Sequence, residues 1–261
     1  MHKLLLIFIF SSHLLWSATA EQVEHYISIS TAEEELLLLE SQFSAMQNGF
    51  SEDANGEKKT YDMELLSVRF KDYLQRNLSE NEMDEVLENY NNVVYLQFVS
   101  TTMISPEENE TEAYIKSLKE DDESKARVEI LEDINNALHN KDSMIVMFDN
   151  LMKPLMQNGI GGADMSDEMM KQRRASYMKS MVENAKKETL YNLKEFSIEE
   201  LKELLDVVKR PSMGYEVKAV YGATAYALKE FFLSMASRYD ISKHQPKKKS
   251  QSTSRETNSS K

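Results

Sequence analysis

Methionine is the residue type whose spacing offers the most chemistry in this chain. Of its 16 methionines, nine lie between Met144 and Met181. Met144 with Met147, and Met178 with Met181, form two pairs three residues apart. Thioethers are soft ligands that suit Cu(I), so these four residues are candidate copper ligands. The same spacing places each pair on one helix face, where methionine fills gaps in a core or lines a groove, and packing is the preferred interpretation.

Other catalytic or metal-binding patterns are missing from the sequence. The chain has no cysteine, which excludes disulfides, thiolate metal sites and thiol nucleophiles. His25, His139 and His244 are scattered and form no H-E-x-x-H pattern, and there is no G-x-S-x-G elbow. The glycines of residues 159–162 lack the Lys-Ser or Lys-Thr of a phosphate loop and are interpreted as a link between helices. The sequence therefore predicts no catalytic residue and no cofactor.

Clustered acids and tyrosines give two weaker alternatives. The acids at residues 33–35 and 199–200 resemble paired carboxylates, but they fall in predicted first turns of helices, where the helix dipole favours them. Four tyrosines can line a pocket or form an amphipathic rim around a helical core, and the rim is the preferred interpretation. These are Tyr191, Tyr215, Tyr221 and Tyr226.

Helices must position all of these side chains. Apolar residues recur with helical periodicity almost throughout, and only seven glycines and four prolines interrupt them, so the sequence predicts an all-α fold of about nine helices. The predicted helices span residues 31–49, 60–77, 79–103, 107–120, 125–139, 142–158, 166–194, 197–209 and 212–240.

Two helix starts share one pattern, 118 residues apart. Ser79 with Glu82, and Ser197 with Glu200, match the capping box, in which serine and glutamate satisfy each other's backbone N–H groups. The motif Met-Gln-Asn-Gly also occurs twice, starting at Met46 and at Met156. We therefore predict two tandem related helical units, residues 31–104 and 125–241, joined by an acidic connecting helix at 105–124.

The second unit resembles the bacterial exported family called domain of unknown function 2059. The resemblance is carried by Phe-Ser-Ile-Glu-Glu-Leu-Lys-Glu-Leu-Leu at 196–205 and by the Pro and Gly break at 211–214. It covers Ala126 to Tyr239, with a weaker copy from Ala32 to Met103. The resemblance implies a periplasmic helical domain and carries no catalytic residue across.

The two ends of the chain predict export and a charged tail. Lys3, an apolar run and Ala18-Thr19-Ala20 predict a signal peptide, residues 1–20, cleaved after Ala20. Residues 242–261 predict a disordered basic tail, because they lack apolar residues and contain six Lys and Arg against one acid. The tail has a net charge of +5. Because the whole chain has a net charge of −13, the remaining residues have a net charge of −18.

Charge and hydropathy together restrict the function. An acidic body repels phosphate backbones, which argues against a nucleic-acid partner, and no later segment is apolar for long enough to span a membrane. We predict a periplasmic or secreted binding or envelope-maintenance module whose partner is an unknown protein or envelope component. The tail is a candidate for electrostatic contact with an anionic surface. The alternatives are an envelope enzyme whose site the sequence does not reveal, and a methionine-based Cu(I)-binding protein.

Overall fold

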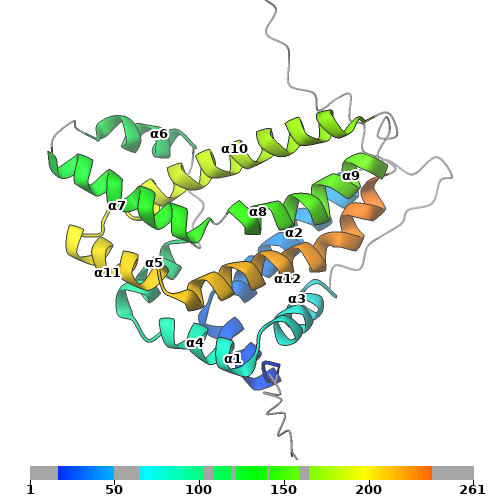
Figure 1. The fold of residues 1–261 in the computed structure, drawn as a ribbon, viewed down its shortest axis with the longest axis horizontal. Coiled ribbons are helices and arrows are strands. Elements are labelled where there is room, and N and C mark those ends of the chain that lie inside the picture. Colours follow the sequence, from blue (N-terminus) through cyan, green and yellow to red (C-terminus); the bar gives the residue numbers. More distant parts are fainter. Residues whose placement is uncertain are drawn as a thin grey trace, which may run out of the picture.

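The computed structural model describes residues 17–49, 65–102, 108–118, 122–139, 141–158 and 165–236, and these ranges are helical (Figure 1). A single antiparallel bridge between Ser17 and Ser79 is the only strand-like pairing recorded within them. The predicted all-α fold is therefore confirmed. The elements are α1 (Ala20–Ile29), α2 (Ala32–Gly49), α3 (Leu65–Asn77), α4 (Glu80–Asn89), α5 (Val93–Thr102), α6 (Glu108–Ser117), α7 (Asp122–Leu138), α8 (Lys141–Met147), the π-helical turn η1 (Phe148–Met152), α9 (Lys153–Asn158), α10 (Asp167–Asn192), α11 (Ile198–Val208) and α12 (Pro211–Ala236).

Both predicted capping boxes are confirmed. The Ser79 amide donates to Glu82 Oε2 at 2.8 Å, and the Glu82 amide donates to Ser79 Oγ at 3.3 Å. The corresponding distances between Ser197 and Glu200 are 2.7 and 3.2 Å. The two helices α4 and α11 therefore start with the same local geometry.

The two helices also bury matching residues. The four apolar residues that follow the caps at equivalent positions are fully buried: Met83, Val86, Leu201 and Leu204. Leu87 and Leu205, one residue further along each helix, are only half-buried and pack against the edge of the core. The equivalent position is thus partly exposed in both helices, because the apolar face meets the exposed face there.

The helix predicted over 79–103 is broken in two. α4 ends at Asn89, and Asn92 Oδ1 accepts the Tyr95 amide at 2.8 Å, which satisfies a free N–H at the start of α5. Asn is a good cap and needs no Pro or Gly to start a new helix. α5 and α12 thus begin 118 residues apart, at Val93 and Pro211.

The two breaks lie against each other in the fold. α4 packs on α12, and α5 packs on α11. Asn89, which is 1% exposed, donates to Ser212 Oγ at 2.9 Å, and Asn92 donates to Glu203 at 2.8 Å. α12 begins one residue earlier than the predicted helix at 212–240, because Pro211 suits a first helical position, and the Ser212 side chain bonds to Asn89. The duplication itself stays a prediction.

α12 runs through the middle of the helices and packs against α3, α4, α7, α8, η1 and α9 (Figure 1). Its approach to α3 requires a glycine, because a Cβ on Gly222 would lie 2.6 Å from Cζ of Tyr73. One hydrophobic cluster contains buried residues of both predicted units, among them Met83 and Leu201. The units therefore share a core.

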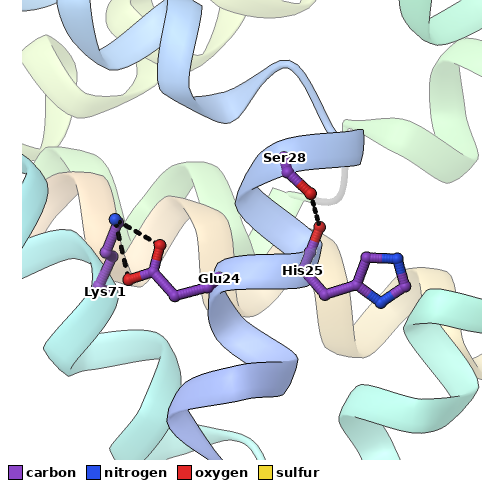
Figure 2. Close-up of polar contacts among 4 residues, drawn as sticks. All are labelled: Glu24, His25, Ser28 and Lys71. Atoms are coloured by element: carbon purple, nitrogen blue, oxygen red, sulfur yellow. Dashed lines mark hydrogen bonds and ion pairs between the residues drawn. The ribbon is translucent and has the colours of Figure 1, made fainter.

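Polar contacts fasten the outer helices. Arg127 of α7 donates to the carbonyls of Leu193, Lys194 and Phe196 at 2.6 to 2.8 Å, where α10 ends and the turn to α11 begins. Lys71 of α3 pairs with Glu24 of α1 at 2.8 Å (Figure 2). Among the helices described, none combines the length and apolar character needed to cross a membrane.

Candidate functional site

A cavity of about 340 Å³ lies between α1, α2, α3, α5, α7, α10 and α12. Its volume falls at the small end of the range of small-molecule sites, which is about 300 to 1,000 Å³. Most of its lining is apolar and aromatic, with a few polar groups. The apolar lining is contributed by Leu36, Phe70, Phe98, Val99, Leu138 and Val220, among others.

One carboxylate in the cavity wall is surrounded by tyrosines. Glu216 of α12 is 6% exposed, and its Oε1 accepts the hydroxyl of Tyr26 at 3.0 Å and that of Tyr90. Its Oε2 accepts the Tyr95 hydroxyl at 3.2 Å. All four side chains line the cavity. Within the part of the chain that the structure describes, Glu216 has no ion pair, and its recorded hydrogen bonds come from these three hydroxyl groups.

The tyrosines come from three segments that meet because α4 docks on α12. Tyr26 lies on α1, Tyr90 follows the last residue of α4, and Tyr95 lies in the first turn of α5. Their rings are in edge-to-face contact, with centroids 5.9 Å apart for Tyr26 and Tyr90 and 5.1 Å for Tyr90 and Tyr95. These contacts hold the hydroxyl groups around one carboxylate.

Burial shifts the titration of this cluster. Removal from water raises the pKa of Glu216, and the three hydroxyl donors oppose that shift. The pKa of each tyrosine is raised well above its ordinary value, chiefly by burial and also by the charge of Glu216. The tyrosines therefore stay protonated and act as donors.

The elbow between α1 and α2 brings two unsatisfied hydroxyl groups to the cavity. Ser30 is 9% exposed, and neither its Oγ nor the Oγ1 of Thr31 has a hydrogen-bond partner within the described structure. Thr31 has φ of 60°, a left-handed conformation that is strained for a β-branched residue. Buried polar atoms without partners and backbone strain both cluster at functional sites.

The other polar groups of the lining are acids and one histidine. Glu35 and Glu188 line the cavity and also reach solvent, and partial burial raises the pKa of each carboxyl. Burial lowers the pKa of His139, whose Nδ1 lies 3.3 Å from the Tyr221 hydroxyl. Neither lysine nor arginine lines the cavity in the part of the chain described.

The candidate copper ligands lie away from this cavity lining. Met144 of α8 is fully buried, whereas Met147 on the same helix and Met178 and Met181 on α10 are half-buried. Other methionines form a small cluster around buried Phe148 and Met156, with Met152, Met165, Met170 and Tyr177 packed against it. Among the described residues, no group of three or more His, Asp and Glu side chains is placed to hold a metal ion.

The remaining candidate site residues from the sequence, which are histidines, glycines and tyrosines, lie in different places. His25 is exposed on α1, and its imidazole points away from the Lys71–Glu24 ion pair (Figure 2). His244 and the glycines at 159–162 lie outside the described residues. Of the four tyrosines considered, only Tyr221 reaches the cavity, and Tyr215 and Tyr226 are exposed.

Sequence reasoning missed Glu216 and its three tyrosines. The available signal was the register of α12: Glu216 lies three residues after Met213 and seven before Ala223, and both neighbours are buried. An acid at a buried helical position needs a partner, but periodicity does not identify that partner.

Comparison with known proteins identified no relative of this chain. No family model matches the chain, and no curated protein and no solved structure matches it either.

Proposed function

We propose that the chain is a non-enzymatic binding protein whose central cavity holds a small ligand with an apolar body and a polar end. The observation that carries this proposal is the set of buried polar groups that line one cavity. Glu216 accepts hydrogen bonds from three hydroxyl donors, and the hydroxyls of Ser30 and Thr31 have no partner among the residues that the structure describes. If this volume were only a gap in the hydrophobic core, its walls would be expected to be apolar, because buried polar groups without partners cost free energy.

One face of α12 supports the same function. Val217, Val220, Tyr221 and Thr224 are half-buried and line the cavity. Part of this mostly apolar face of α12 is thus directed at an open volume and not at another side chain.

A neutral fluorescent dye tests the proposal. 1-N-phenylnaphthylamine emits more strongly in apolar sites, so its emission should rise on titration with the protein and saturate at one dye per chain. Thr224→Phe places a ring in the cavity and should weaken dye binding at least tenfold. Lys229→Phe, at an exposed position of the same helix, should leave it unchanged. Equal binding by both variants would refute the cavity as the site.

Export to the periplasm or outside the cell is part of this proposal. It is supported by the leader-like residues 1–20 and by the absence of cysteine. Thr19 caps α1 in a capping box with Gln22, and the Ala18 amide donates to the Leu78 carbonyl at 2.9 Å. Cleavage after Ala20 would remove both contacts. Intact-mass analysis of the native protein should give a chain starting at Glu21, and a chain that keeps Thr19 would contradict that cleavage site.

Copper binding is retained as the second candidate, because nine methionines lie between Met144 and Met181. Competition with a Cu(I) chelator decides the matter. If Met144, Met147, Met178 and Met181 are ligands, replacing all four with leucine should abolish binding while keeping most of the packing volume. Equal binding by the variant and the wild type would exclude them as ligands.

A further inference from the structure

We infer that the ligand of the central cavity is a protonated amine with an apolar body, and that its ammonium group pairs with Glu216. This inference rests on the proposed binding function and adds the chemical class of the ligand to it.

The charge of the lining selects a cation. Glu35, Glu188 and Glu216 line the cavity, and the structure places no lysine or arginine there among the residues it describes. A carboxylate or phosphate ligand would add a like charge beside a buried carboxylate, which costs free energy in a low-dielectric site. An ammonium group would instead supply the opposite charge that Glu216 lacks within the described chain.

The hydrogen bonds of Glu216 leave room for such a group. Each carboxylate oxygen accepts about two hydrogen bonds. Oε1 already accepts two, from Tyr26 and Tyr90, whereas Oε2 accepts one, from Tyr95. One acceptor position therefore remains on Oε2, and an N–H of an ammonium group can fill it with a charge-assisted hydrogen bond.

The rest of the cavity provides further acceptors and an apolar wall. Ser30 and Thr31 belong to the same lining, and their hydroxyl groups have no partner in the described ranges, so they can accept other ammonium protons. Phe70, Phe98 and Val99 offer apolar surface for an alkyl or aryl body, and aromatic rings attract cations through their negative faces. The rim acids Glu35 and Glu188 add long-range attraction for a cation entering from solvent.

Three six-carbon compounds with different head groups test the inference. Hexylamine is cationic at neutral pH, hexanol is neutral, and hexanoate is anionic, while their alkyl bodies are alike. Each is titrated against the dye complex of the full-length protein. Hexylamine should displace the dye at a concentration at least tenfold lower than hexanol, and hexanoate should be the weakest competitor.

Variants assign the preference to one carboxylate. Glu216→Gln keeps the shape but removes the charge and replaces one acceptor oxygen with an NH2 donor, so hexylamine should lose at least tenfold in affinity and its advantage over hexanol. Glu230→Gln, an exposed residue of the same helix, should keep the full preference. Glu216→Met provides a second uncharged variant should the glutamine variant fail to fold.

The outcomes separate the two proposals. If the three compounds displace the dye equally from the wild type, or if hexylamine binds both Glu216 variants as it binds the wild type, the amine assignment is wrong and the cavity is still a binding site. If the dye itself does not bind, the proposed function fails, and the cavity is a water-filled part of the core.

Discussion

Removing one buried side chain from each predicted unit tests whether they fold together. Met83 of α4 and Leu201 of α11 are both fully buried in the same hydrophobic cluster, at positions 118 residues apart. Replacing either with alanine leaves a cavity and should lower the free energy of unfolding by about 2 to 5 kcal/mol. For a chain of this size each kcal/mol lowers the midpoint of thermal unfolding by about 2 to 4 °C, so either variant should lose roughly 4 to 20 °C.

Urea and thermal unfolding should be followed by far-UV circular dichroism and by near-UV signals of the tyrosines. We expect one transition, coincident for both probes and shifted as a whole in each variant, because the two helices contribute to one core. Leu87→Ala and Leu205→Ala are matched controls at half-buried positions and should cost less than their buried neighbours. Two separate transitions, of which Met83→Ala shifts only one, would show that the units are independent and that the shared core is wrong.

Four further outcomes are expected. Arg127→Ala should lower the free energy of unfolding by about 2 kcal/mol in urea titrations, because it leaves three carbonyls without a charged donor, and an unchanged midpoint would contradict that role. Gly222→Ala should destabilise the protein although alanine favours helices, because its Cβ would overlap the Tyr73 ring, and a raised melting temperature would argue against that contact. Thr31→Gly should raise the free energy of unfolding by about 1 to 2 kcal/mol by relieving the left-handed strain, measured by the same titrations, and a loss would mean that the strain is absent. Burial raises the pKa of Glu216, so the folded state binds this proton more tightly than the unfolded state, and stability falls as the pH rises above the ordinary glutamate pKa. Glu216→Gln should therefore gain stability relative to the wild type as the pH is raised, measured by urea titrations at several pH values, and a difference that does not change with pH would refute the shift.

Local signals in the sequence predicted local structure well. Apolar periodicity was sufficient for the all-α fold, and the Ser79 and Ser197 capping boxes formed as expected because both partners lie within one helical turn. The break before α5 was missed because Asn92 caps that helix without Pro or Gly. α1 was missed because Ala18-Thr19-Ala20 was interpreted as the end of a signal peptide. In the structure, Thr19 is the N-cap of α1, and threonine is a good residue for that position.

The cavity could not be predicted because its polar groups are distant in sequence. Tyr26, Tyr95 and Glu216 are brought together by packing among α1, α5 and α12, and no periodicity within a single helix contains that information. The unsatisfied hydroxyl of Ser30 is likewise visible only when its neighbours are known. Sequence reasoning instead emphasised methionines, which are dense in the chain, but among the described methionines only Met213 lines this cavity.

The central position of α12 has a consequence for the timing of folding. It is the last helix described, and it packs against helices from both halves of the chain, from α3 to α9. The earlier helices that α12 covers therefore cannot complete the burial of their apolar faces until residues 211–236 have been made, and such long-range closure slows folding. A chain ending at Arg210 should accordingly remain sensitive to protease while the complete chain resists it, and a protease-resistant truncated chain would show that the earlier helices fold without α12.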